Sequence, residues 1–69
     1  MNKKELKISL AAARVNAGLT QKEFAKACGV SEATVIKWES GKSYPSIGKL
    51  GVLEAVLGLS VGNIRWSRK

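Results

Sequence analysis

Apolar residues recur along the chain at the three- and four-residue spacing of α-helices, in short stretches separated by glycine. No segment shows the pattern of a strand, so every predicted element is a helix. The spacing groups the apolar residues into five buried faces: Leu10, Ala13 and Ala17; Phe24, Ala25 and Cys28; Val35 and Trp38; Ile47, Leu50, Leu53 and Leu57; and Val61 with Ile64.

Capping residues and glycines set the predicted helix ends. A serine or threonine precedes each helix, and a glycine follows each of the first four. Thr20 and Glu23 have the spacing of a capping box, in which each side chain accepts a hydrogen bond from the other's backbone N–H. The predicted helices therefore begin after Ser9, Thr20, Ser31, Ser46 and Ser60, and the first four end at Gly18, Gly29, Gly41 and Gly58.

The chain of 69 residues is long enough for one domain with one core. We expect a basic amino-terminal arm over residues 1–8, a domain over residues 9–66 and a basic tail over residues 67–69. Asn2 and Glu5 also have capping-box spacing, which leaves open an earlier start of the first helix. The predicted fold is all-α, a compact five-helix domain.

The charge predicts an anionic partner. Lys and Arg number 12 against 5 acidic residues, which gives a net charge of +7. Such an excess favours a polyanion or an anionic surface, although a surface charged only for solubility remains the alternative.

The residue types present argue against an enzyme. His and Asp are both absent, and Cys28 is the single cysteine, so the usual zinc sets and an intramolecular disulfide are excluded. We expect no cofactor, no metal and no catalytic residue. No apolar run approaches the length of about 20 residues that a membrane span needs, and we expect a cytoplasmic protein without a membrane partner.

The second and third helices adjoin through a turn of only a few residues. Two short helices that cross steeply need a small residue where they approach, here Ala25, and a residue that tolerates positive φ at the turn, here Gly29. Val35 then packs the third helix onto the second. This arrangement predicts a helix with an exposed amino-terminal end, of a diameter that fits the major groove of DNA.

The stretch "AGLTQKEFAKACGVSEATVIKWESGK", followed by Pro45 and "LEAVLGLSV", resembles the helix-turn-helix of the Cro and repressor class of phage and bacterial regulators. The resemblance covers about residues 9–64. It implies a repressor that binds a double-stranded DNA operator, usually as a symmetric homodimer, with the third helix in the major groove. Regulation is then expected to come from concentration, competition at shared sites or a partner protein.

The resemblance also implies roles for individual residues. It places Glu32, Ala33, Thr34 and Lys37 at or near base edges, with chemistry that suits each of them. It implies a structural ion pair between Arg14 and Glu39. Phosphate contacts are expected from Gln21, Ser31, Lys42 and Ser43, and the arm lysines Lys3, Lys4 and Lys7 are candidates for further contacts.

The helix predicted over 47–57 departs from a regular pattern. Gly48 and Gly51 each cost about 1 kcal/mol of helix propensity, and Glu54 falls on the apolar side. A weak or bent helix is one explanation. A dimer contact is the other, with Glu54 paired to Arg65, and its predicted residues are Glu54, Leu57, Ile64, Arg65 and Trp66.

Two other functions remain open. The same fold could serve as a protein-interaction module, such as an antitoxin, through exposed apolar side chains. A binder of nucleic acid or anionic membranes that acts through charge alone is the second alternative. The apolar contacts of an interaction module would come from Ala11, Ala12, Val15, Ile36 and Trp66.

Overall fold

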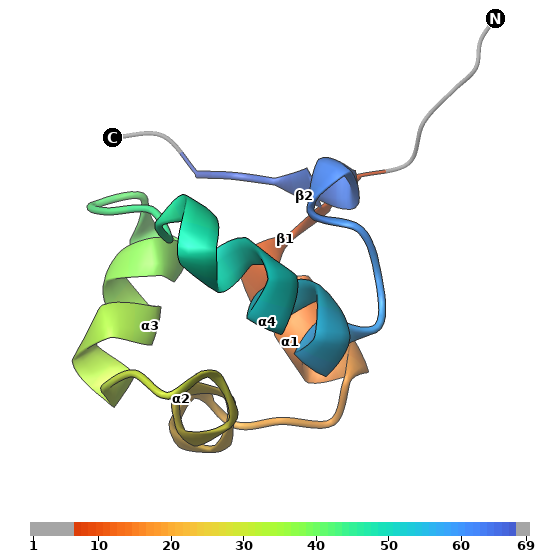
Figure 1. Cartoon of the computed structure of the whole chain (residues 1–69). Coiled ribbons are helices and arrows are strands. Elements are labelled where there is room, and N and C mark those ends of the chain that lie inside the picture. Colours follow the sequence, from red (N-terminus) through yellow and green to blue (C-terminus); the bar gives the residue numbers. More distant parts are fainter. Residues whose placement is uncertain (1–6, 68–69) are drawn as a thin grey trace, which may run out of the picture.

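The computed structural model describes residues 7–67, in which four α-helices surround one core and a short sheet lies at its edge (Figure 1). In chain order the elements are β1 (Ile8–Ser9), α1 (Leu10–Asn16), α2 (Gln21–Cys28), α3 (Glu32–Ser40), α4 (Ile47–Leu57), a 3₁₀ helix (Val61–Asn63) and β2 (Ile64–Arg65). Lys3 and Lys4 of the predicted arm, and the alternative cap of Asn2 and Glu5, lie outside the described residues.

The first four predicted helix starts, after Ser9, Thr20, Ser31 and Ser46, are confirmed. Ser9 accepts a hydrogen bond from the Ala12 N–H at 3.0 Å, so α1 begins after Ser9. The capping box of α2 is complete, with the Glu23 N–H donating to Thr20 Oγ1 at 3.0 Å and the Thr20 N–H donating to Glu23 Oε1 at 2.9 Å. Ser46 precedes α4 without a side-chain hydrogen bond to the helix.

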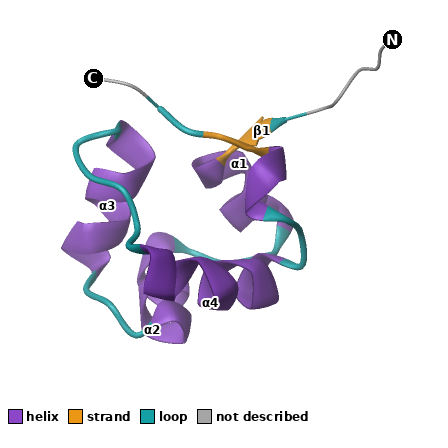
Figure 2. Cartoon of the chain, turned by 45° about the horizontal axis from the view of Figure 1, so that its top comes forward, coloured by secondary structure: helices purple, strands orange, loops and turns teal. Residues whose placement is uncertain are grey.

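The core takes one fully buried large side chain from each of three helices: Phe24 from α2, Val35 from α3 and Leu53 from α4. Full burial of a side chain of this kind contributes about 2 kcal/mol. α2 packs against both α3 and α4, and α1 packs against α3 (Figure 2). The remaining buried apolar residues are Leu10, Ala13, Ala25, Cys28, Trp38, Leu57 and Ile64.

Two residues predicted on buried faces are exposed. Ala17 is exposed at the C-cap of α1, beyond Leu10 and Ala13, the two residues that this helix buries in the core. Ile47 is 87% exposed, because it is the first residue of α4 and lies beyond the edge of the core. The predictions for both residues were wrong.

The prediction of five helices and an all-α fold was also wrong. Among the described residues there are four α-helices, and Ser60 caps only a 3₁₀ turn. Gly62 and Asn63 favour helix poorly, and Ile64 is extended, with φ −93° and ψ 128°. Ile64 instead pairs with Ile8, which the sequence had placed in the arm, in a parallel two-stranded sheet.

The segment after β2 packs against the carboxyl end of α3. Ser67 Oγ donates to the Glu39 carbonyl oxygen at 3.1 Å, and the Tyr44 hydroxyl donates to the Ser67 carbonyl oxygen. Gly41 ends α3 with φ 83° and is buried beneath this segment, where an added Cβ would lie 2.9 Å from the Ser67 oxygen. A glycine is therefore required at position 41 for two reasons: the backbone has a positive φ, and Ser67 leaves no space for a Cβ.

Three glycine-to-alanine substitutions separate these two requirements. Gly58 has φ 73° with open space around it, so Gly58→Ala is expected to cost about 1 kcal/mol of unfolding free energy. Gly41→Ala adds the collision with Ser67 and is expected to cost at least about 1 kcal/mol more. Gly51 is exposed within α4 with open space around it, so Gly51→Ala should stabilise by about 0.5 to 1 kcal/mol. Urea unfolding measures all three, and equal losses for Gly41→Ala and Gly58→Ala would contradict the packing of Ser67.

Candidate nucleic-acid interface

The turn between α2 and α3 has the geometry that the sequence predicts. Ala25 is buried with 3% exposure, and Gly29 has φ 75°. The Val30 N–H donates to the Ala25 carbonyl oxygen at 2.9 Å, which closes the end of α2. Val35 is completely buried and fixes α3 against α2.

The two sides of α3 differ sharply. Val35 and Trp38 face the core, while Glu32, Ala33 and Lys37 are exposed. Burial of the inner side fixes the rotation of the helix about its axis, so the outer side is presented in one orientation.

Ser31 and Thr34 hold the first turn of α3. Ser31 Oγ accepts from the Thr34 N–H at 3.1 Å, and the two hydroxyl oxygens lie 2.9 Å apart in a second hydrogen bond. Thr34 is half-buried, whereas Ser31 is exposed. The predicted base contact of Thr34 would therefore come from the accessible part of a side chain whose hydroxyl already has a partner.

Arg14, Gln21 and Glu39 form a network that the sequence predicts only in part. Arg14 Nε lies 2.7 Å from Glu39 Oε2, with side-chain exposures of 14% and 10%. Gln21 Nε2 donates to the other carboxylate oxygen, Glu39 Oε1, at 2.9 Å. Arg14 Nη1 also donates to the Leu19 carbonyl oxygen at 2.8 Å. Gln21, expected at a phosphate, is thus held at the start of α2 by Glu39.

The loop after α3 carries the other two predicted phosphate contacts. The backbone N–H groups of Lys42 and Ser43 both donate to the Lys37 carbonyl oxygen, at 3.0 and 3.3 Å. These bonds fold the loop back on the end of α3 and leave the Lys42 side chain exposed. Gln21, held by Glu39, and Lys42 therefore both lie beside the carboxyl end of α3.

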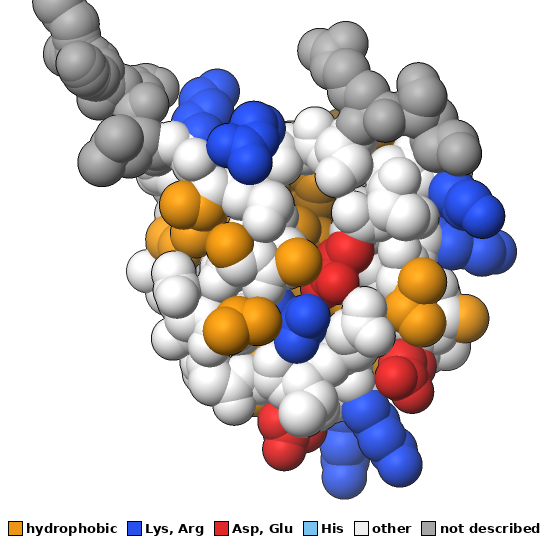
Figure 3. All heavy atoms as spheres, turned by 180° about the vertical axis from the view of Figure 1, so that it is seen from behind, with side chains coloured by type: hydrophobic (Ala, Val, Ile, Leu, Met, Phe, Trp, Pro, Cys, Tyr) orange, Lys and Arg blue, Asp and Glu red, His pale blue; other side chains and the backbone are white. Residues whose placement is uncertain are grey.

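Figure 3 views the molecule from behind, on the side away from the viewer of Figure 1. Basic side chains lie at several places around the edge of this face, acidic side chains lie beside them along its lower edge, and one acidic and one basic side chain are neighbours near its middle. The overall excess of Lys and Arg over acidic residues attracts the phosphate backbone of nucleic acid without regard to sequence. Within residues 7–67, no three His, Cys, Asp or Glu side chains come together in a way that could hold a metal ion.

Comparison with known families agrees with this geometry. A model of the helix-turn-helix family matches residues 10–63, which is most of the chain. The chain belongs to the helix-turn-helix family. It is a DNA-binding domain of the Cro and repressor type, in a family of transcription regulators that bind double-stranded DNA and are not enzymes. No curated protein matches the chain.

None of the helices formed by residues 7–67 is both long enough and apolar enough to span a bilayer.

In this helix-turn-helix domain, the five residues predicted at a dimer contact differ in their surroundings within one copy of the chain. Leu57 and Ile64 are core residues, with 9% and 3% exposure. Within one copy, Glu54 does not pair with Arg65, and Glu54 Oε2 instead accepts from the Val61 N–H at 2.8 Å and caps the 3₁₀ turn. Arg65 and Trp66 lie beside Tyr44 and Lys7, around a cavity described below.

Some structural contacts gave no signal in the sequence. Lys49 Nζ, on α4, donates to the Cys28 carbonyl oxygen at the end of α2, at 2.9 Å. A cation at the carboxyl end of a helix interacts favourably with the helix dipole, and here it also donates a hydrogen bond to the Cys28 carbonyl oxygen. Burial raises the pKa of the Cys28 thiol, and the nearby Lys49 charge opposes the increase. Because these residues lie on different helices, no local pattern could reveal the contact.

The Glu39 network can be tested through stability. Glu39→Gln removes the charge that faces Arg14 and puts an amide N–H₂ group among donors, so we expect a loss of about 1.5 to 3 kcal/mol in unfolding free energy. The matched control is Glu32→Gln on the exposed side of α3, where the loss should stay below about 1 kcal/mol. Equal small losses in urea unfolding would show that the network contributes little.

Proposed function

We propose that this domain is a sequence-specific repressor of the Cro type that inserts α3 into the major groove of a near-palindromic operator. The observation that carries the proposal is the division of α3 into an inner side fixed by Val35 and Trp38 and an exposed outer side with Glu32, Ala33 and Lys37. A recognition helix needs this division, since its side chains can contact particular bases only if the helix is held in one orientation.

The outer side of α3 has suitable chemistry for direct base contacts. Lys37 can donate to O6 and N7 of guanine, and Glu32 can accept from N4 of cytosine. The methyl groups of Ala33 and Thr34 can pack against the methyl group of thymine. These side chains differ in what they recognise, so together they can distinguish one short sequence from others.

Phosphate contacts would place α3 in the groove. Gln21 donates one amide hydrogen to Glu39, which leaves its second amide hydrogen for a phosphate oxygen. Lys42 and Ser43 supply a second contact beside the same carboxyl end of α3, and Ser31 adds a hydroxyl at the start of the helix. The Glu39 network would then act as a positioning device for Gln21.

A single short helix reads only a few base pairs, so two copies are needed for a site of useful specificity. We propose that two copies bind DNA as a symmetric dimer, with recognition helices about 34 Å apart. Such a dimer on a promoter excludes competing proteins by occupying the site, which requires no activity other than binding.

Selection of DNA tests sequence specificity. Duplexes with a randomised region are selected on the wild-type chain and on Lys37→Ala at about 150 mM salt, where purely electrostatic binding is weakened. We expect an enriched near-palindrome that loses its preference at one position of each half-site in Lys37→Ala.

The matched control is Lys26→Ala, which removes an exposed lysine from α2 and should leave the preference unchanged. A pool that stays random with the wild-type chain would contradict sequence-specific binding. Partner proteins that contact Ala11, Ala12, Val15 or Ile36 would then be examined instead.

The role of Lys42 is tested by salt dependence. Lys42→Ala should weaken binding to every sequence by a similar factor. It should also make the negative slope of log affinity against log salt shallower by about one, because one phosphate contact is lost. Fluorescence anisotropy with the selected duplex and with an unrelated duplex measures both effects. A changed preference at one base pair, with an unchanged slope, would place Lys42 at a base instead of a phosphate.

A further inference from the structure

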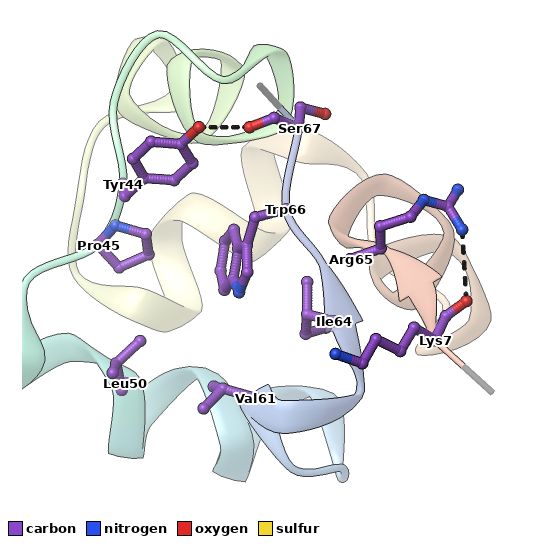
Figure 4. A pocket seen from close by; sticks show the side chains of 9 residues that line it. All are labelled: Lys7, Tyr44, Pro45, Leu50, Val61, Ile64, Arg65, Trp66 and Ser67. Carbon is purple, nitrogen blue, oxygen red and sulfur yellow. Dashed lines mark hydrogen bonds between the residues drawn. The ribbon is translucent and has the colours of Figure 1, made fainter. Parts of the chain in front are cut away.

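A cavity of about 620 Å³ lies between the loop after α3, α4, the 3₁₀ helix and β2 (Figure 4). Its volume is within the range of about 300 to 1,000 Å³ that is usual for small-molecule sites. Of the residues expected to contact DNA, Lys7 of the amino-terminal arm lines it, whereas none of those on α2, α3 or the loop after α3 does. The apolar lining comes from Tyr44, Pro45, Leu50, Val61, Ile64 and Trp66.

The aromatic walls of the cavity are fixed before any ligand arrives. The Tyr44 and Trp66 rings meet edge to face, with centroids 6.2 Å apart and planes at 85°. The Tyr44 hydroxyl donates to the Ser67 carbonyl oxygen, and Ser67 is itself bound to the end of α3. A ligand therefore would not have to order these side chains, which removes part of the entropic cost of binding.

The charged lining of the cavity is only positive. Lys7 and Arg65 are the charged residues at its edge, and no acidic residue lines it. Arg14–Glu39 is the one ion pair that residues 7–67 form, so neither Lys7 nor Arg65 has a carboxylate partner there. In Figure 4 the Lys7 ammonium group extends towards Ile64 and the cavity, while the Arg65 guanidinium points away and donates to the Lys7 carbonyl oxygen.

We propose that this cavity binds a small amphipathic carboxylate. An aromatic or branched apolar body packs between Trp66 and Leu50, and the carboxylate pairs with the Lys7 ammonium group. Apolar walls with a single cation at the opening are complementary to a ligand that has an apolar body and one negative charge. The site does not depend on the proposed DNA-binding function, and its test needs no DNA.

The test is an NMR titration of the wild-type ¹⁵N-labelled chain with 3-phenylpropanoate. The Trp66 indole N–H and the Ile64 amide should shift and saturate, with a dissociation constant of a few millimolar, as expected for a ligand of about ten non-hydrogen atoms. The amides of Val15 and Ile36, two exposed apolar residues outside the cavity, should not shift. A Trp66→Phe spectrum assigns the indole signal.

Two analogues and two variants test the role of charge. The uncharged 3-phenylpropanamide should bind about two- to fivefold more weakly than the carboxylate, which is the size of an exposed ion pair, and 3-phenylpropan-1-amine should bind still more weakly. Lys7→Gln should reduce carboxylate binding to the level of the amide, without change for the amide. Lys26→Gln, on the exposed side of α2, is the control and should change neither.

Several results would overturn the proposal. These are a Trp66 signal that never saturates, shifts of equal size at Val15 and Ile36, and equal affinities for the carboxylate, the amide and the amine. Sedimentation velocity at the NMR concentration shows whether the chain is a dimer. A dimer whose Trp66 signal does not respond to the probe would also overturn the proposal, because a second copy would then cover the cavity.

Discussion

The Glu39 side chain and backbone join four segments of this domain. Its carboxylate binds Arg14 of α1 through one oxygen and Gln21 of α2 through the other, and its backbone carbonyl accepts from Ser67. Burial of Phe24, Val35 and Leu53 supplies more free energy, but apolar packing has no preferred direction. The hydrogen bonds of Glu39 are directional, and they fix how α1, α2 and the carboxyl-terminal segment meet the end of α3.

The features that the sequence predicts well are those with local causes. Capping residues and left-handed glycines lie within a few residues of the helix ends that they set, so Ser9, Thr20 and Ser31 could be interpreted without knowing the fold. The buried face of each helix follows from spacing alone. The prediction of burial failed only at two helix ends, at Ala17 and Ile47, where the core no longer covers the helix.

The missed features join distant parts of the chain. β1 and β2 come from opposite ends of the described residues, and each strand has only two residues, too few for an alternating pattern. Gln21 with Glu39, and Lys49 with Cys28, are likewise contacts between different helices. The exposed side of α3 in the candidate site could be predicted, because the residues that are not on the buried side of the helix must face outwards. The partners of Gln21, Glu54 and Arg65 could not, because they depend on how the helices are arranged in space.

The carboxyl-terminal segment connects the stability of the fold with the cavity. Ile64 is buried in the core, and Ser67 is bound to the end of α3 and packed on Gly41. These two anchors are required by folding, and they fix the backbone of Trp66 between them. The Trp66 ring is only half-buried, so its position depends more on the anchored backbone at Ile64 and Ser67 than on burial of the ring itself. A large aromatic side chain that is held in place but left partly uncovered has apolar surface available for a ligand, whereas an equally large side chain in the core, Trp38, does not.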